Sequence, residues 1–272
     1  MAREPLGHHR GDPRGGGRRL TDHLLNKSLA FEDLARPAIA PTTKAMRRWV
    51  LRWFFRGNRL GVNGNSKRRV RVRNQKMWEY ARALALTGAS APERKGAGPF
   101  TVLDVGGAMT LPIFYLGDLG DRVLSLDIDQ GLVDETNRTA KKCGLPVEAR
   151  ALNLVDEDPT ADDLGFPGGF DRVYCLCVIE HIVPPGQGKV AERMGKLLKP
   201  GGLLAITFDY GENARSEAPV HTRADVDTLI ETIGLPLHGN PEFVDDGKRY
   251  PISRRYPEQP FTFGSLFFEK PR

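Results

Sequence analysis

The 272-residue sequence predicts an α/β protein with a doubly wound, mostly parallel sheet. First, short apolar runs alternate with amphipathic segments from residue 99 to the end, and strands that alternate with helices pair in parallel through right-handed crossovers. Second, the run Phe100-Thr-Val-Leu-Asp-Val-Gly-Gly107 stops at a glycine pair, which is typical of a strand buried on both faces. Third, Lys199-Pro-Gly-Gly202 separates an amphipathic segment from another apolar run, as the end of a helix does.

The composition is that of an ordinary globular protein, with 40% hydrophobic and 27% charged residues. No apolar run approaches the roughly 18 residues that cross a bilayer, and the first residues lack the apolar centre of a secretory signal. Cys143, Cys175 and Cys177 form no paired framework and lack the spacing of a zinc site. We therefore expect a reduced, cytoplasmic setting.

Residues 1–42 are predicted to form a basic, largely flexible arm with one short helix between positions 20 and 40. The first 76 residues hold 19 Lys and Arg against 5 Asp and Glu, although the net charge of the whole chain is +6. Such an arm is compatible with nucleic acid, an anionic membrane surface or an acidic substrate. A solvated tail is the simplest interpretation.

Residues 43–98 are predicted to form an N-terminal helical lid. In a helix that begins at Thr43, the residues Met46, Trp49, Val50 and Trp53 recur at a spacing of three and four. Because arginines occupy much of the remaining surface, this helix is either a membrane-surface helix or one that packs on its own domain. The short apolar stripe favours packing. A second helix is expected at 74–86.

Residues 99–272 are predicted to form one ligand-binding core. Strands are expected at 100–105, 122–127, 147–152, 170–178, 203–208, 242–244 and 261–269, and helices at 111–119, 131–143, 188–198 and 222–233. This set amounts to a seven-stranded sheet. In open sheets of this kind, ligands bind at the carboxyl ends of the strands.

The loop after the first of these strands indicates which nucleotide the core binds. Asp127 ends the next strand, 23 residues after Asp104, where a carboxylate accepts hydrogen bonds from both ribose hydroxyls of a bound nucleotide. The run Gly106-Gly-Ala-Met-Thr110 lacks the Gly-x-Gly-x-x-Gly pattern of dinucleotide sites. The pattern disfavours a nicotinamide oxidoreductase and favours S-adenosylmethionine, which has no pyrophosphate to bind.

Five motifs occur in the order seen in class I S-adenosylmethionine-dependent methyltransferases, which the chain resembles from about residue 99 to its end. They are Val102-Leu-Asp-Val-Gly-Gly, Leu124-Ser-Leu-Asp127, Phe170-Asp-Arg-Val, Val178-Ile-Glu-His-Ile182 and Leu197-Leu-Lys-Pro-Gly-Gly-Leu-Leu-Ala-Ile-Thr207. The resemblance, which is to the small-molecule, methyltransferase-11-like branch, implies a Rossmann-like sheet. It also implies that the last strand runs antiparallel in a hairpin with its predecessor.

The resemblance implies S-adenosylmethionine as cofactor and S-adenosylhomocysteine as product. It assigns the methionine part of the cofactor to Asp104, Gly106, Gly107 and Ala108, and the ribose to Asp127. It further places Asn153 at the adenine amine, with Leu154 and Ile128 beside the ring, and Leu176 against the cofactor. Ala108 and Thr110 stand where many relatives have glycine.

The candidate catalytic residues are Glu180, His181 and His221. His181 has an ordinary pKa close to working pH and is suited to act as a base; the alternative is that Glu180-His181 is structural. Ubiquinone-biosynthesis O-methyltransferases and plant-type small-RNA 2′-O-methyltransferases resemble the chain here, with Glu-x-x-Glu-His and a divalent cation. This sequence has Cys177-x-x-Glu180-His181, and a soft thiol is a poor ligand for Mg²⁺. A divalent metal is therefore not favoured.

The leading hypothesis is a methyltransferase that acts on an oxygen or nitrogen atom of a small molecule. One alternative is an RNA methyltransferase that uses the basic arm, although no recognised RNA-binding module is present. Another is a catalytically silent module that binds S-adenosylmethionine. The sequence does not indicate the acceptor or the oligomeric state.

Overall fold

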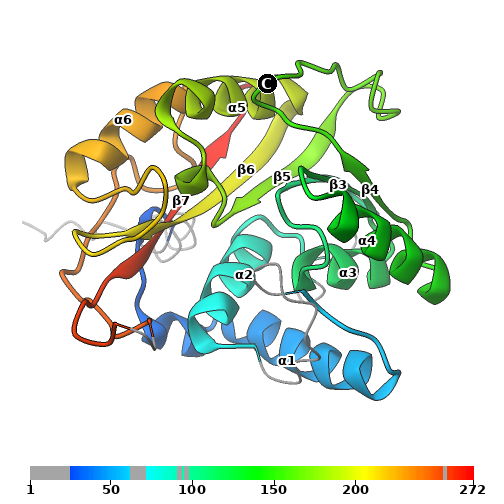
Figure 1. Ribbon diagram of the computed structural model, residues 1–272, viewed down its shortest axis with the longest axis horizontal. Coiled ribbons are helices and arrows are strands. Elements are labelled where there is room, and N and C mark those ends of the chain that lie inside the picture. The colour runs from blue at the N-terminus through cyan, green and yellow to red at the C-terminus, as the bar shows by residue number, and fades with distance from the viewer. Residues whose placement is uncertain (1–24, 62–71, 91–93, 95–97, 254–255) are drawn as a thin grey trace, which may run out of the picture.

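The computed structural model describes residues 25–61, 72–90, 94, 98–253 and 256–272. Its centre is a seven-stranded sheet with the order β1-β7-β6-β5-β2-β3-β4 (Figure 1). The strands are β1 (Lys27–Ser28), β2 (Thr101–Val105), β3 (Arg122–Asp127), β4 (Val147–Ala151), β5 (Phe170–Leu176), β6 (Leu198–Tyr210) and β7 (Thr262–Glu269). Strands β2 to β6 pair in parallel, and β7 is antiparallel to β6. The predicted mostly parallel, doubly wound sheet with an antiparallel last strand is confirmed.

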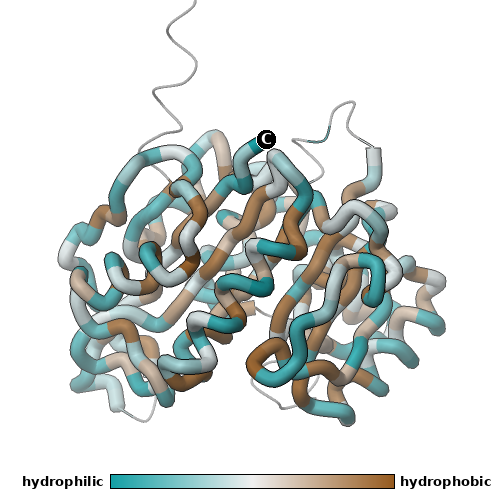
Figure 2. Tube along the Cα trace, turned by 90° about the horizontal axis from the view of Figure 1, so that it is seen from above, coloured by the Kyte–Doolittle hydropathy of each residue, from teal (hydrophilic) through white to brown (hydrophobic). Residues whose placement is uncertain are grey.

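The middle of the sheet is buried on both faces because alternate residues of a strand point to opposite sides. In β2, Val102 packs into the core shared with α1 (Ala40–Phe55), α2 (Asn74–Leu86), α3 (Leu111–Asp118) and α4 (Gln130–Cys143). Its neighbour Leu103 packs into the core shared with α5 (Pro184–Leu197) and α6 (Arg223–Ile233). Figure 2 shows the hydrophobic strand segments between helices whose residues alternate in hydropathy.

The helices begin and end at the residues that local chemistry favours. The carboxylate of Asp129 accepts from Leu132 N and caps α4, which ends at Gly144 in the left-handed conformation. Thr222 and Asp225 form a capping box at the start of α6. Two short 3₁₀ helices, η1 (Phe31–Ala35) and η2 (Ile179–His181), complete the described elements. No helix in the described ranges has both the length and the apolar character needed to cross a membrane.

The amino-terminal region differs from the predicted flexible arm. Residues 25–30 are buried and include β1, and the short helix within the predicted span 20–40 is η1. The amide of Asn26 donates to the carbonyls of His238 (3.1 Å) and Asn240 (2.7 Å), and its oxygen accepts from Phe267 N (2.7 Å). These bonds attach the segment to the sheet, so residues 25–42 belong to the folded domain. The rest of the predicted arm, residues 1–24, lies outside the described residues.

The expected hairpin at the end of the chain is also wrong. Glu242–Val244 was predicted to be the strand that precedes and pairs with β7, but β1 takes that place, pairing Lys27 with Ser265. Val244 forms only an isolated bridge to Lys27, on the outer side of β1. The amino-terminal strand therefore separates the 242–244 segment from β7.

Helices α1 and α2 form as expected and pack over the sheet, below it in Figure 1, with α5 and α6 above. The apolar stripe of α1 is buried: Trp49 stacks on Trp53, and Trp53 stacks on Phe114 of α3. Packing on its own domain, the favoured interpretation of α1, is thereby confirmed. The role of α1 and α2 as a lid stays a prediction.

Candidate functional site

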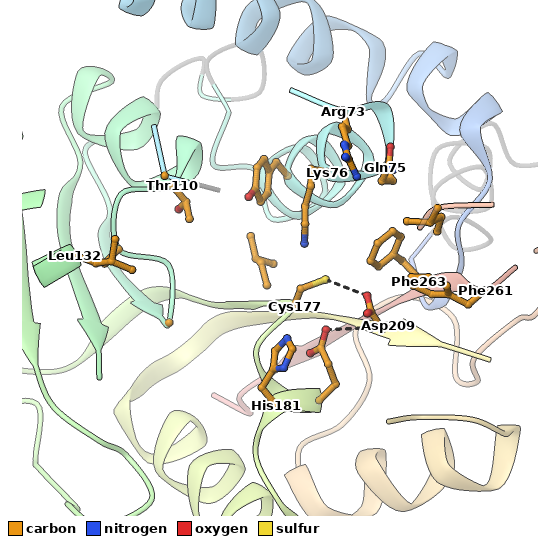
Figure 3. Close-up of a pocket in the computed structure, with 17 residues that line it drawn as sticks. Arg73, Gln75, Lys76, Thr110, Leu132, Cys177, His181, Asp209, Phe261 and Phe263 are labelled. Carbon is orange, nitrogen blue, oxygen red and sulfur yellow. Dashed lines mark hydrogen bonds between the residues drawn. The ribbon is translucent and has the colours of Figure 1, made fainter. Parts of the chain in front are cut away.

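A cavity of about 610 Å³ opens at the carboxyl ends of β2, β5 and β6, beneath the start of α2 (Figure 3). This edge of a parallel sheet is where such folds bind ligands. The lining residues come from the loop after β2, the turn after β5, the end of β6, the first turn of α2 and the start of β7. They include Lys76, Tyr80, Gly106, Ala108, Leu176, Cys177, Glu180, His181, Asp209, Phe261 and Phe263.

The glycine pair after β2 is required by its surroundings. Gly106 has a φ of +73°, and a Cβ atom there would lie 2.7 Å from Cγ2 of Val178. A Cβ atom on Gly107 would overlap the carboxylate of Asp104. Neither position can hold a larger residue without displacing its neighbours, and Gly106 lines the cavity with backbone alone.

Two carboxylates support the loop from below. Asp104 is buried and accepts from the hydroxyl of Ser125 at 2.9 Å. Burial raises the pKa of Asp104 to about 7, and the nearby charge of Asp127 adds to the shift. Asp127 accepts from the N–H groups of Ala108 (3.2 Å) and Asp129 (3.0 Å). Asp127 therefore ties the end of β3 to the glycine loop.

The remaining residues assigned to the cofactor lie at different places. Leu176 lines the cavity. Ile128 follows Asp127 and is 78% exposed, whereas Leu154 is buried in the core beneath α5. Asn153 donates to Asp156 at 2.7 Å and accepts from Val155 N at 3.0 Å, so its side chain shapes its own turn. None of the last three is among the lining residues, and their contacts with adenine stay a prediction.

A buried polar cluster joins α2 to the ends of β5 and β6. Glu79 Oε2 accepts from the thiol of Cys177 at 2.7 Å and from the hydroxyl of Thr207 at 2.9 Å. Its other oxygen lies 3.1 Å from Nζ of Lys76. Figure 3 shows Lys76 extending across the cavity toward Cys177 and Asp209. The sequence prediction missed Lys76 and Glu79; the available signal was a pair of opposite charges three positions apart in the first half of α2.

The charges of this cluster follow from burial. Burial by itself would lower the pKa of Lys76, but the carboxylate of Glu79 beside it raises the pKa, so Lys76 remains an ammonium. Burial raises the pKa of the Cys177 thiol well above its ordinary value, and Glu79 adds to this shift. Cys177 is therefore a neutral thiol that donates a hydrogen bond to Glu79 and keeps its proton.

Glu180 and Asp209 form a second pair at the wall of the cavity. Glu180 Oε1 accepts from Asp209 N at 3.1 Å, and within the described ranges its buried Oε2 has no hydrogen-bond partner. Burial raises the pKa of Glu180 to about 7, with a further contribution from Asp209. Burial likewise raises the pKa of Asp209 to about 6. Both carboxyls therefore exchange protons close to neutral pH.

The structure separates the two candidate histidines. His181 lines the cavity, and its Nδ1 lies 2.6 Å from a carboxylate oxygen of Glu217. His221 precedes α6, where its ring faces the carbonyl of Ala214 at 3.4 Å, and it does not line the cavity. Glu180 and His181 are thus brought together, and His221 is not. Their catalytic roles stay predictions.

The only group of potential metal ligands found in the described part of the chain is Cys177, Glu180 and Asp209, whose ligand atoms lie within 4.8 Å of one another. Asp209 stands in this set in place of His181, which belongs to the corresponding sequence run. The neutral Cys177 thiol already donates to Glu79, and a thiol is poorly matched to a hard cation. The donor set does not fit Mg²⁺.

Comparison of sequences identifies the kind of domain. Residues 103–204 match a family model described as a methyltransferase domain. A ubiquinone biosynthesis O-methyltransferase of Xanthomonas euvesicatoria is 32% identical over 106 residues, 39% of this chain and 41% of that protein. An uncharacterised protein of Synechococcus sp. is 28% identical over 144 residues, 52% of this chain and 32% of that protein. The chain thus spans about a third to two fifths of these relatives.

Solved structures with low sequence identity share the fold. One is the 1,6-didemethyltoxoflavin-N1-methyltransferase of Burkholderia thailandensis, which was solved with 1,6-didemethyltoxoflavin and S-adenosylhomocysteine. It is 19% identical in sequence, and the two structures superpose with a TM-score of 0.50 over 71% of this chain and 77% of that one. The [4+2]-cyclase SpnF is 14% identical with a TM-score of 0.54, covering 85% and 94%. Because these two proteins carry different reactions in their names, the likeness shows the fold alone.

Proposed function

Because this chain carries a methyltransferase domain of the class I, Rossmann-like type, we propose that it is an S-adenosylmethionine-dependent enzyme that methylates a small-molecule acceptor at an oxygen or nitrogen atom. The observation that carries the proposal is the shared cavity. On one side lies the glycine loop at Gly106–Ala108, and on the other lie two carboxyls that titrate near neutral pH, Glu180 and Asp209.

The residues at the glycine loop fit this cofactor. Gly106 has no side chain and lines the cavity, so a ligand can contact the backbone of the loop there. Asp127 already accepts two N–H donors, and the same oxygens are suited to accept from ribose hydroxyls. When bound, S-adenosylmethionine supplies an electrophilic methyl group on a sulfonium centre. We assign its amino-acid part to the loop above Asp104, and its ribose to Asp127.

The opposite wall supplies the acid–base chemistry. Methyl transfer to a hydroxyl or an ammonium requires the loss of one proton from the acceptor. In its ionised form Glu180, which lines the cavity, accepts that proton, while Asp209 N–H holds Oε1 in place. Phe261 and Phe263 line the same cavity and offer contacts to an apolar or aromatic part of the acceptor. About 610 Å³ is a typical volume for a small-molecule site.

Oxygen is the acceptor atom that the relatives favour. Several curated relatives are named as ubiquinone biosynthesis O-methyltransferases, and the one from Xanthomonas euvesicatoria is 32% identical over the aligned residues. The N-methyltransferase among the solved structures supports only the fold, at 19% identity. We therefore propose a hydroxylated small molecule as the first class of acceptor to test.

Calorimetric titration of the full chain with S-adenosylhomocysteine tests the cofactor assignment. We expect saturable binding that weakens by about 10- to 100-fold in Asp127→Ala, the range for lost hydrogen bonds to a charged group. Asp134→Ala, an exposed carboxylate on α4, is the matched control. Absence of binding to both S-adenosylmethionine and S-adenosylhomocysteine would overturn the proposal. Methyl-labelled cofactor and panels of phenols, catechols and amines then identify the acceptor by mass spectrometry.

A further inference from the structure

The outer face of α1 carries a continuous stripe of exposed residues. Their spacing of three and four positions places them on one side of the helix. We call this set the basic stripe; it consists of Lys44, Arg47, Arg48, Leu51, Arg52, Phe55, Arg56 and Arg59, the last just beyond the helix. Phe55 is 82% exposed and Leu51 is 45% exposed. The stripe therefore combines six cations with an exposed apolar pair.

This stripe is not needed to hold α1 on the protein. The opposite side of the helix buries Met46, Trp49, Val50 and Trp53 in the core. The stacked rings of Trp49 and Trp53 and the bond from Trp49 Nε1 to Asp118 (2.9 Å) fix the helix in place. The exposed Phe55 and Leu51 are thus surplus to folding, and an apolar pair rimmed by polar residues is the arrangement of a contact surface.

The cations of the stripe have no acidic partner among the residues that the structure describes. Residues 40–61 contain no Asp or Glu, and across the described ranges none of the six cations forms an ion pair. Within the same ranges, one side chain of the six forms a hydrogen bond: Arg47 donates to Asn74 at 3.2 Å. Asn74 begins α2, whose next residues Gln75 and Lys76 line the cavity, so the stripe adjoins the rim of the candidate site.

We propose that the basic stripe docks the protein on an anionic lipid surface. Arginine and lysine side chains bind the phosphates of anionic headgroups, and each such residue near the surface strengthens binding by about fivefold. Leu51 and Phe55, one helical turn apart, enter the boundary between headgroups and acyl chains, as the apolar residues of interfacial helices do. Because only these two side chains insert, the protein binds at the surface and reversibly.

The apolar pair distinguishes a lipid surface from a nucleic acid. Phosphate binding by arginine is common to both partners. An RNA strand offers a stacking partner for Phe55, but it offers none for the aliphatic Leu51 beside it. A bilayer interface accommodates both side chains at once. It is also an extended surface, so the whole stripe from Lys44 to Arg59 can contact it.

Flotation of the full chain with vesicles tests this proposal. We expect binding to phosphatidylcholine vesicles that contain phosphatidylglycerol, little binding to phosphatidylcholine alone, and a steep loss of binding at high salt. Arg48→Glu/Arg52→Glu should weaken binding by about 25-fold or more, from the loss of two cations at about fivefold each. Leu51→Ser/Phe55→Ser should weaken it by about tenfold, from the lost apolar contact.

Matched controls separate the stripe from the rest of the surface. Arg138→Glu changes an exposed charge on α4, and Val183→Ser changes a side chain that is 58% exposed; both should bind vesicles like the parent protein. Arg48→Gln/Arg52→Gln removes the same two positive charges without introducing negative ones. Thermal unfolding verifies that each variant folds. Vesicle binding that survives in every stripe variant would overturn the proposal. So would RNA binding that depends on Arg48 and Arg52 without any vesicle binding.

Discussion

Asp104 shows how a single buried residue couples the candidate site to stability. Its carboxyl lies under Gly107 and accepts from Ser125. Burial raises its pKa from an ordinary value of 3.8 to about 7. A carboxyl with a higher pKa in the folded chain binds its proton more tightly there. Its contribution to the free energy of unfolding is therefore constant below about pH 4, falls as pH rises to about 7, and is constant again above that.

We predict that Asp104→Asn removes this dependence on pH. Between about pH 4 and about pH 7 the parent protein should lose on the order of a few kcal/mol more unfolding free energy than the variant. Urea denaturation without cofactor, at several pH values in this range, measures the difference. Asp163→Asn is the control. Hydrogen bonds from Thr160 lower the pKa of that exposed carboxyl, so Asp163 changes the free energy of unfolding only below about pH 4. If the free energy of unfolding changed with pH equally in the parent protein and in Asp104→Asn, the prediction would be contradicted.

Glu180 is the residue to which we assign proton removal. Because burial raises its pKa to about 7, the rate of methyl transfer should rise with pH through this value as the carboxyl ionises. We predict that Glu180→Gln slows transfer by about 10²- to 10⁴-fold and removes this limb of the pH–rate profile, while S-adenosylhomocysteine still binds. Glu192→Gln, on the exposed side of α5, serves as control. An unaltered profile in Glu180→Gln would assign the base to another group.

At the scale of elements, glycines within one helix have opposite requirements. In α5, a Cβ atom at Gly186 would lie 2.9 Å from Cγ2 of Ile182, whereas one at Gly188 would lie 3.6 Å from Thr232, an ordinary contact. Gly186 therefore permits close packing of the turn that follows β5. Gly188 only loosens the helix, because glycine costs more backbone entropy than alanine.

We predict opposite signs for two neighbouring substitutions in α5. Gly188→Ala should raise the free energy of unfolding by about 0.5–1 kcal/mol, and Gly186→Ala should lower it because Ile182 and Val155 must move. Chemical denaturation of both variants against the parent measures the two effects. Since the same substitution is made two positions apart, a change of the same sign in both would contradict the packing argument.

At the scale of the whole molecule, the candidate site depends on a contact between distant segments. Glu79 of α2 accepts from Cys177 after β5 and from Thr207 in β6. The bonds span 98 and 128 positions of sequence, and they attach the helix that covers the cavity to the sheet that forms its floor. Lys76 neutralises Glu79 while its own side chain lines the cavity.

We predict that Glu79→Gln destabilises the fold by about 2–4 kcal/mol. This is somewhat below the usual cost of breaking a buried ion pair, because the Lys76 side chain remains 20% exposed. Lys76→Met/Glu79→Gln should recover part of the loss, since no unpaired charge is left. Urea denaturation measures both variants. Glu148→Gln, half-exposed on β4, should change stability by about 0.5 kcal/mol or less. Equal effects at positions 79 and 148 would contradict the prediction.

Much of the fold could be predicted because its signals are local. Three of these signals depend on residues only a few positions apart. They are the glycine pair after β2, the end of a helix at Lys199-Pro-Gly-Gly202, and the spacing of apolar residues by three and four in α1. The methyltransferase domain inferred from such motifs is confirmed by the family model over residues 103–204. The strand at Lys27–Ser28 could not be predicted, since two residues carry no periodicity and the bonds of Asn26 reach positions beyond 230.

The sequence by itself determined the succession of strands and helices from β2 to β6, the kind of domain, and the glycine loop with Asp104 and Asp127. These features arise from backbone preferences and short-range patterns. Only the tertiary structure decided which polar groups share the cavity: it joined Lys76 and Glu79 to Cys177, paired Glu180 with Asp209, and left His221 outside. Such groupings depend on which strand ends and helix faces meet in space, and that depends on packing across the whole chain.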